Sequence, residues 1–197
     1  MEKSIKLTDT KNLLINLDRA PERLEKSTKV LTDLEIPFER FSAVEHSQGI
    51  IGCGLSHQKL LSEIKPNTLI MEDDIGSMPQ ASNVLLDIPE EAHAVYLGVS
   101  NHGYINRPFG VADCVLAAQY SQKYKRVFNM CSTHAILYLS QDYIDASHEM
   151  TTKCLKEGRP FDLGLAALHR YFCILTPNEP YFYQTEQPKL TRFSLEG

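Results

Sequence analysis

Short apolar runs alternate with amphipathic stretches along the first half of the chain. Residues 12–18 and 38–44 each have the alternating or continuous apolar pattern of a strand, and residues 68–75 begin as a buried strand. Between the first two, residues 20–35 place leucines at helical spacing with charged residues elsewhere, and Pro21 suits the first helical turn. Two strand-to-helix steps in succession favour a parallel sheet.

The second half has weaker but similar signals. Residues 99–125 have mixed polar and turn residues, which predicts a long loop with a small hairpin. The tail, 176–184, is rich in proline and aromatic residues, so we expect it to fold over a site rather than form a core helix. The remaining expected elements are strands at 94–98, 127–130 and 134–139, and helices at 141–157 and from Phe161 onward.

Glycines interrupt the pattern between the second and third strands. The stretch 49–57 contains three glycines, and we expect a glycine-bearing loop that opens a helix near Ser56. Its spacing matches neither G-x-G-x-x-G nor a Walker A motif. A helix amino terminus preceded by small residues can bind an anion such as phosphate. The alternative is that these glycines only make a turn.

These patterns predict one α/β domain over residues 1–197, built on a mixed, mostly parallel sheet flanked by helices. Within it we expect a nucleotide-binding half at about 10–100 and an acceptor half at about 101–197. A length of 197 residues and 43% hydrophobic residues are enough for one good core.

Composition narrows the classes of function. The net charge is −5, from 20 basic and 25 acidic residues, and no basic run is present, which disfavours non-specific nucleic-acid binding. The start, 1–6, has no apolar run behind it, and no window approaches a membrane span, so we expect a cytoplasmic protein without a signal peptide or transmembrane segment. Five scattered cysteines without a C-x-x-C pair indicate free thiols.

Three consecutive carboxylates, Glu72, Asp73 and Asp74, follow the apolar residues of the third strand. A sheet interior cannot hold this charge, so we expect the acids at the carboxyl end of the strand, where open α/β sheets bind ligands. Alternation along a strand would direct Glu72 and Asp74 to one side and Asp73 to the other. Such a pair suits Mg²⁺ or Mn²⁺ with water and phosphate oxygens. The alternative is a solvated acidic turn.

Three motifs occur in the order expected for a known family. They are Ile-Asn-Leu-Asp-Arg at 15–19 with Arg23 four residues on, Gly-Cys-Gly-Leu-Ser-His at 52–57, and Leu-Ile-Met-Glu-Asp-Asp at 69–74. This succession resembles glycosyltransferase family 25, which includes lipooligosaccharide galactosyltransferases and collagen galactosyltransferase domains. The resemblance is strong to about residue 75. Beyond it, Thr-His-Ala at 133–135 and Pro-Phe-Asp at 160–162 are similar to later family blocks.

The resemblance implies a GT-A-type, Rossmann-like fold that binds a nucleotide sugar through Mn²⁺ or Mg²⁺. It implies inverting transfer of a hexose, most often galactose from a UDP-sugar, to a hydroxyl of a glycan, a lipid-linked sugar or a protein, as in lipopolysaccharide biosynthesis. Such an acceptor leaves open a peripheral position at the inner membrane face. We expect Asp74 as a direct metal ligand, Glu72 as a direct or water-mediated ligand, and Asp73 near the ribose or donor sugar.

Other candidate donor-binding residues are Asn16, Asp18, Arg19, Ser56 and His57. The first three follow the first strand, and Arg19 could pair with a phosphate; for Asp18 and Arg19 the alternative is helix capping and a surface ion pair. His57 has three possible roles: a third metal ligand, a phosphate donor, or a core histidine that locks the loop.

Inversion requires a base that takes the proton of the acceptor hydroxyl, and Asp or Glu is the usual choice. We expect Asp162 in this role because it begins a late helix; the alternative is that Asp162 is only the N-cap. Three rival functions stay open: a metal-dependent hydrolase or phosphatase, a non-catalytic nucleotide-sugar-fold protein in binding or assembly, and a DNA-directed sugar transferase.

Overall fold

One large mixed sheet organises the molecule. The computed structural model describes residues 2–81, 85–100, 102–107, 110–113 and 115–185. The eight strands of this sheet run in the order β10 (Leu116–Gln119), β11 (Tyr124–Asn129), β13 (Ile174–Pro177), β7 (Ala94–Tyr96), β12 (Ala135–Tyr138), β4 (Thr68–Glu72), β2 (Lys11–Asn16) and β3 (Glu39–Ser42).

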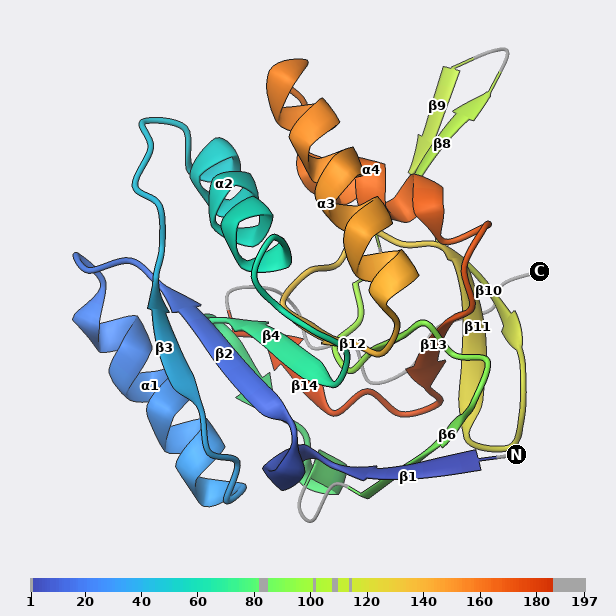
Figure 1. Cartoon of the computed structure of the whole chain (residues 1–197), viewed down its shortest axis with the longest axis horizontal. Helices are drawn as coiled ribbons and strands as arrows, with labels where there is room; N and C mark the ends of the chain where they lie inside the picture. Colours follow the sequence, from blue (N-terminus) through green and yellow to red (C-terminus); the bar gives the residue numbers. More distant parts are fainter. Residues whose placement is uncertain (1, 82–84, 101, 108–109, 114, 186–197) are drawn as a thin grey trace.

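The end of the sheet that carries β3, β2 and β4 is parallel. Its chain path is β2, α1 (Pro21–Asp33), β3, α2 (Gly49–Leu61) and β4, so β2 lies between the two strands that follow it. The two helices cover opposite faces, since Leu31 of α1 belongs to one hydrophobic cluster and Leu60 of α2 to the other (Figure 1). This arrangement is a Rossmann-like β-α-β-α-β unit, and its carboxyl strand ends form the expected type of crevice.

The rest of the sheet is mostly antiparallel. Only β7 and β13 pair in parallel there, and the pairs β12–β4, β12–β7, β11–β13 and β10–β11 are antiparallel. The predicted mixed α/β sheet flanked by helices is therefore confirmed, with its parallel strands concentrated at one end. Helices α3 (Gln141–Lys156) and α4 (Phe161–Leu168) pack on the same face as α2 (Figure 1).

Two hydrophobic clusters sandwich the sheet. The cluster on the α2, α3 and α4 face includes Tyr96, Tyr143 and Phe161, all buried. The cluster on the α1 face includes Leu14, Met71 and Phe182. Because consecutive residues of β4 alternate between these clusters, with Ile70 in one and Met71 in the other, the continuous apolar run of this strand is buried on both sides.

Three small sheets complete the fold. The antiparallel pair β1 (Glu2–Lys6) and β6 (Leu85–Pro89) was not expected from the sequence, and η1 (Leu7–Asp9) and η2 (Pro79–Ala81) are short 3-10 turns. The hairpin predicted within 99–125 exists as β8 (Tyr104–Arg107) and β9 (Gly110–Asp113). The tail does return to the acidic stretch, because β14 (Phe182–Gln184) pairs with β5 (Ile75–Ser77).

The expectation of a glycine loop before Ser56 was wrong. Helix α2 begins at Gly49, so the glycine-rich stretch is itself helical. The reason is close packing: a Cβ atom on Gly52 would lie 2.8 Å from the carbonyl oxygen of Val44, and one on Gly54 would lie 2.9 Å from the Leu155 side chain. These glycines allow α2 to approach the loop after β3 and helix α3 more closely than any other residue would.

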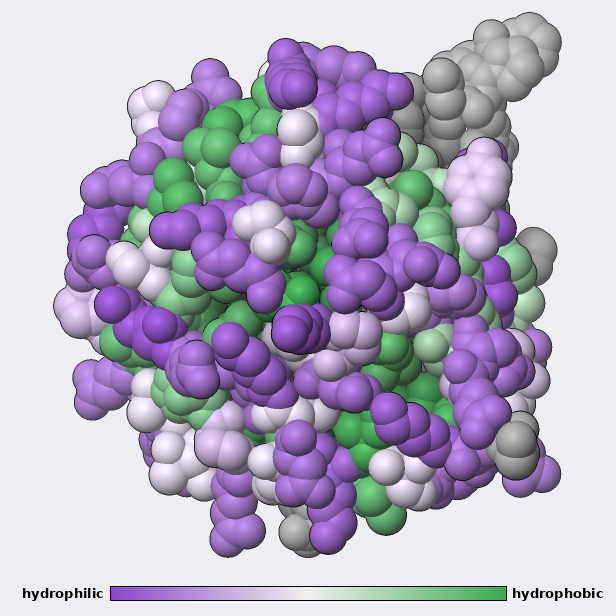
Figure 2. Space-filling model, viewed as in Figure 1, coloured by the Kyte–Doolittle hydropathy of each residue, from purple (hydrophilic) through white to green (hydrophobic). Residues whose placement is uncertain are grey.

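The face seen in Figure 2 is largely hydrophilic, with hydrophobic side chains gathered over α2, where Ile50 is exposed. None of the helices in the described ranges combines the length and apolar character that a membrane span requires.

Candidate functional site

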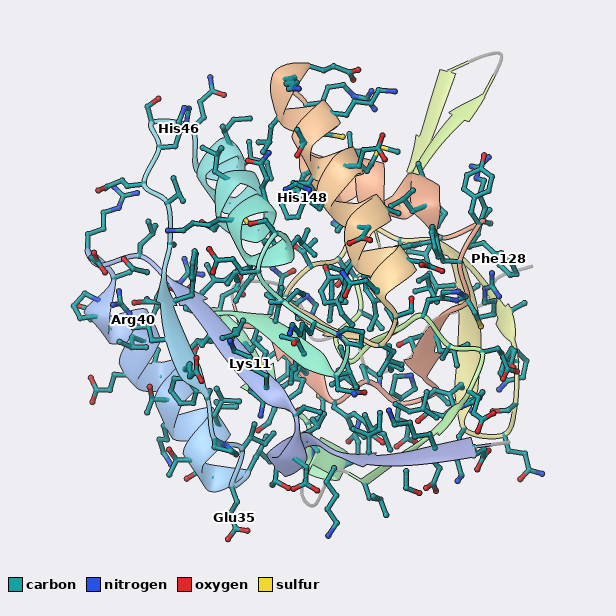
Figure 3. The ribbon with its side chains drawn as sticks, in the orientation of Figure 1. Lys11, Glu35, Arg40, His46, Phe128 and His148 are labelled. Atoms are coloured by element: carbon teal, nitrogen blue, oxygen red, sulfur yellow. The ribbon has the colours of Figure 1, made fainter. Side chains whose placement is uncertain are left out.

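A cavity of about 340 Å³ lies where β2, β3 and β4 end. The position is the one predicted for a ligand site, because α1, which follows β2, and α2, which precedes β4, lie on opposite faces of the sheet. Residues after β2 and β3, the first turns of α2 and the end of β4 line it: Ile15, Asn16, Leu17, Arg19, Arg23, Ala43, Val44, His46, Gly49, Gly52, Cys53, Ser56, Glu72 and Asp73. His46 lies on the loop that joins β3 to α2 (Figure 3).

Glu72, the last residue of β4, turns toward α2. Its Oε1 lies 3.1 Å from Nε2 of His57 and 3.7 Å from Sγ of Cys53. Burial alone favours the neutral acid, but the hydrogen bond and electrostatic attraction from His57 outweigh burial and lower the pKa of Glu72 to about 2. Glu72 is therefore a carboxylate at every physiological pH.

His57 is fully buried and its ring packs on Phe161 of α4, with the ring centroids 4.8 Å apart. Its Nδ1 has no hydrogen-bond partner within the part of the chain that the structure describes. The ligand atoms of Cys53, His57 and Glu72 all lie within 4.8 Å of one another. Contact with Glu72 agrees with a ligand role or a structural role for His57, whereas a direct contact with a phosphate would require His57 to reach a cavity that it does not line.

Asp73 is held by the protein itself. Its Oδ2 accepts a hydrogen bond of 2.6 Å from Asn16, its Oδ1 lies 2.9 Å from the Arg23 guanidinium, and its carbonyl oxygen accepts a hydrogen bond from Ser27. Burial raises the pKa of Asp73 and the contacts with Asn16 and Arg23 oppose that rise. These contacts fix the turn between β4 and β5.

Asp74 is held less completely. Its Oδ2 accepts a hydrogen bond of 3.1 Å from Gln184 and lies 3.5 Å from Arg23, while its carbonyl oxygen accepts one from the backbone of Thr185. The other carboxylate oxygen, Oδ1, is buried without a hydrogen-bond partner among the described residues. Burial and the neighbouring charge of Glu72 raise the pKa of Asp74 to about 6.

The expected alternation of side chains ends at Glu72. Strand β4 ends there, so Asp73 and Asp74 lie in a turn and share Arg23, while Glu72 faces His57. The prediction that Glu72 and Asp74 point together and Asp73 points away was therefore wrong. Period-2 geometry applies only while the backbone is a strand.

A divalent cation fits this group of acids. The carboxylates of Asp73 and Asp74 share one guanidinium, and a buried carboxylate oxygen of Asp74 lacks a partner within the described ranges. Oxygen ligands with excess negative charge suit Mg²⁺ or Mn²⁺. Glu72, Asp73 and Asp74 are the residues that would hold such an ion.

The side chains of Asn16 and Asp18 mainly form hydrogen bonds and ion pairs within the protein. Asn16 donates to Asp73 and to the carbonyl oxygen of Ala20, and its own side-chain oxygen accepts a hydrogen bond from Arg40. Asp18 is exposed and pairs with Arg40 and Ser42, and the hydrogen bond from Arg40 is the main reason that the pKa of Asp18 is lowered. Asn16 lines the cavity and Asp18 does not.

Two arginines supply positive charge to the cavity wall. Arg19 is exposed and lies 3.2 Å from Glu45, an exposed ion pair that a ligand phosphate could displace. Arg23 projects from the first turn of α1 and pairs with Asp73 and Asp74, which we call the acidic turn. Arg23 was not among the predicted site residues, although its spacing from Arg19 in the motif similar to family 25 pointed to it.

Ser56 lies inside α2 rather than before it. Its hydroxyl accepts a hydrogen bond from the backbone N–H of Val44 and donates one to the carbonyl oxygen of Gly52. The hydroxyl proton of Ser56 is therefore already bonded within the protein. The first helical residue, Gly49, lines the cavity instead, and the free N–H groups at this end of the helix can attract an anion.

Asp162 was expected at the N-cap of the last helix, but Pro160 occupies that position and Asp162 lies in the first turn of α4. Helix α4 begins at Phe161, two residues before the start that an N-cap at Asp162 would give, because the fixed backbone of Pro160 suits a helix boundary. Burial raises the pKa of Asp162, and the charge of Glu72 adds to this shift. Asp162 is not among the residues that line the cavity.

Comparisons with known proteins identify no family. No protein-family model matches the chain, and no curated protein matches it. Among solved structures, it is similar to the CTP:phosphocholine cytidylyltransferase LicC from Streptococcus pneumoniae, with a TM-score of 0.41 and 8% identity over 88% of this chain and 92% of that chain. We draw no functional conclusion from a similarity of this size.

Proposed function

We propose that this protein is a metal-dependent glycosyltransferase that takes a hexose from a nucleotide sugar. The observation that carries the proposal is the cavity itself: carboxylates, arginines and a helix amino terminus face one space of about 340 Å³ at the carboxyl ends of parallel strands. A sugar nucleotide needs these three kinds of group, since its diphosphate binds cations and N–H donors and its hydroxyls bind carboxylates. The motifs similar to glycosyltransferase family 25 support the same interpretation.

The acidic turn is the proposed metal site, with Asp74 and Glu72 as ligands and Asp73 beside them. A divalent cation bound there would neutralise the charge that develops on a departing diphosphate. Asp73 is already fixed by Asn16 and Arg23, so it can keep the turn in place when Asp74 exchanges Arg23 for the cation.

The cavity wall opposite the acids is the proposed diphosphate and nucleotide site. Arg19 can exchange its exposed partner Glu45 for phosphate, and Gly49, the first residue of α2, lines the same cavity. Uridine and galactose are expected from the family resemblance, because a choice among bases or hexoses depends on a few hydrogen bonds in the pocket.

We propose Asp162 as the base of an inverting reaction. Its raised pKa suits a group that must accept a proton from an acceptor hydroxyl. The acceptor would be a hydroxyl of a glycan, lipid-linked sugar or protein, bound on the α4 side of the site. Asp162→Asn should lower kcat by about 100-fold or more while donor affinity changes less than about 3-fold.

One observation favours a non-catalytic binding protein instead. Arg23 contacts both Asp73 and Asp74, so in this conformation the protein supplies its own cation to two of the three acids. The glycosyltransferase proposal requires a divalent cation to compete with this arginine.

A binding titration tests the proposal. UDP-galactose, UDP-glucose and UDP are titrated in Mn²⁺ or in chelator against the wild type, Asp74→Ala and Asp33→Asn, whose exposed partner on α1 is Lys29. We expect Mn²⁺-dependent binding that Asp74→Ala weakens at least about 10-fold and the Asp33→Asn control retains. If no nucleotide sugar binds under any of these conditions, the non-catalytic interpretation takes its place.

A further inference from the structure

We propose that Cys53, His57 and Glu72 form a second metal site, which is specific for zinc or a similar borderline-soft cation. The expected hard-cation site uses the acidic turn, whereas this site uses one sulfur, one nitrogen and one oxygen ligand. It requires neither a nucleotide nor an acceptor, so it stands independently of the proposed transferase activity.

Two of the three distances within the trio are close to those between ligands of one tetrahedral zinc ion. Zinc bonds of about 2.0–2.3 Å at tetrahedral angles put a nitrogen and an oxygen ligand about 3.3 Å apart, and an oxygen and a sulfur ligand about 3.5 Å apart. The corresponding distances here are 3.1 Å from His57 Nε2 to Glu72 Oε1 and 3.7 Å from Cys53 Sγ to the same oxygen. The third distance, between Cys53 Sγ and the ligating nitrogen of His57, is no more than 4.8 Å, whereas a nitrogen and a sulfur ligand of one zinc ion are about 3.5 Å apart. A zinc ion can therefore enter if the side chain of Cys53 moves toward His57 by on the order of 1 Å.

The fold holds all three ligands on rigid elements. Cys53 and His57 are four residues apart in α2, so they lie on one face of the helix, and Glu72 ends the central strand β4. Gly52 and Gly54 allow α2 to pack closely at this point, and Phe161 packs on the His57 ring. Side chains positioned in this way lose little conformational entropy when they bind an ion.

The site also has an entry path and a fourth position. Cys53 and Glu72 line the cavity while His57 lies behind them, so an ion among the three ligands faces open space on one side. Three protein ligands plus one open position is the arrangement of catalytic rather than structural zinc sites. A thiolate and an imidazole favour Zn²⁺ over Mg²⁺ and Mn²⁺.

Glu72 belongs to both proposed sites, which has a functional consequence. Zinc bound by the trio occupies at least one oxygen of Glu72, so micromolar zinc should compete with Mn²⁺ at the acidic turn. The thiol proton of Cys53 is released to solvent as the ion binds.

Cobalt substitution tests this site directly. The tag-free, reduced protein is titrated with Co²⁺ in the absence of nucleotide, and the absorption spectrum is recorded before and after addition of Zn²⁺. We expect thiolate-to-cobalt charge-transfer bands and intense tetrahedral ligand-field bands, both removed by stoichiometric Zn²⁺. An unchanged solvent-like cobalt spectrum in the folded wild type would overturn the proposal, whatever the protein does with nucleotide sugars.

Substitutions of Cys53 and Glu72 test whether each residue is a ligand of the proposed zinc site. Cys53→Ser should abolish the charge-transfer bands and weaken zinc binding by more than the roughly 10- to 100-fold typical of supporting residues, and Glu72→Gln should weaken it while the thiolate bands persist. Cys131→Ser is the matched thiol control and should leave the spectrum unchanged. Mass spectrometry adds a test on the wild type alone, because Zn²⁺ should protect Cys53 from alkylation more than Cys131; equal protection would contradict the assignment.

Discussion

Glu72 and Asp74 are separated by one residue, yet the fold shifts their acidities in opposite directions. The pKa of Glu72 is lowered from 4.5 to about 2, and that of Asp74 is raised from 3.8 to about 6. Both carboxylates are largely buried, with side chains that are 16% and 11% exposed. The difference lies in their partners: Glu72 has His57 for itself, whereas Asp74 shares the one guanidinium of Arg23 with Asp73.

The protein pairs the carboxylate of Glu72 with His57, whereas one oxygen of the Asp74 carboxylate is available to a ligand. Glu72 contributes to stability as an anion, and Asp74 is a buried anion with an unpartnered oxygen in the described part of the chain. A buried charge that opposes folding is typical of a binding site, and a divalent cation is a suitable partner for the carboxylates of Asp73 and Asp74.

The largest effect is expected for Glu72→Gln. The substitution keeps an acceptor for His57 but removes the charge that lowers the pKa, so we expect the free energy of unfolding to fall by about 2–3 kcal/mol at pH 7. Because the folded pKa lies below the ordinary value, this contribution is complete above pH 4.5 and disappears as the pH falls toward 2. Urea unfolding between pH 3 and 7 measures it; an equal loss at every pH would indicate packing rather than charge.

Asp74→Asn should act in the opposite direction. Removal of a buried, repelled charge should raise the free energy of unfolding by about 1–3 kcal/mol at pH 7.5 with chelator present. The folded pKa lies above the ordinary value, so wild-type Asp74 becomes protonated in the folded state below pH 6, and the advantage of Asn should vanish near pH 3.8. With saturating Mn²⁺ the order should reverse. A destabilised variant at pH 7.5 in chelator would contradict the idea of an unsatisfied charge.

Gly52→Ala tests whether the close packing of α2 places Cys53 and His57 against Glu72. The new Cβ would lie 2.8 Å from the carbonyl oxygen of Val44, so α2 must shift away and carry Cys53 and His57 with it. We expect a loss of about 1–2 kcal/mol despite the better helix propensity of alanine. Gly49→Ala is the matched control, since nothing lies within 4 Å of its Cβ. The control should be neutral or stabilising by up to about 1 kcal/mol; equal effects would show that the close approach is unimportant.

Gln184→Ala should have the smallest effect. The substitution removes one hydrogen bond of 3.1 Å to Asp74, so the free energy of unfolding should fall by about 0.5–1 kcal/mol. The pKa of Asp74 should rise further, because this hydrogen bond favours the carboxylate. Carbon-detected NMR titration of the Asp74 carboxyl group measures the shift. A pKa that falls instead would mean that the tail does not support this anion.

The parallel end of the sheet could be predicted from the sequence because its signals are local. Leu69, Ile70 and Met71 form an apolar run buried on both sides, and the charged residues that follow must leave the sheet. Parallel strands bring their carboxyl ends together, so the proximity of Asn16 to Asp73 followed from topology alone.

Long-range contacts explain what could not be predicted. Gly52 and Gly54 lie inside helix α2 because they pack closely against Val44 and Leu155, and no local pattern distinguishes this use of glycine from a turn. The contrast between Glu72 and Asp74 depends on which residues face each carboxylate, and these come from α1, α2 and the tail. The strands β1 and β6 pair residues that are 79 to 87 positions apart, and they have no strong local pattern.

A crystal structure of the protein with UDP and Mn²⁺, with the anomalous signal of manganese recorded, would show whether Asp74 and Glu72 bind a metal beside a nucleotide. We expect a manganese peak beside Asp74 and Glu72, with the Asp74 contact to Arg23 replaced, and the diphosphate in the cavity between Arg19 and the start of α2. Manganese and nucleotide bound elsewhere, for example in the groove of about 550 Å³ beside Lys123 and Tyr181, would contradict it.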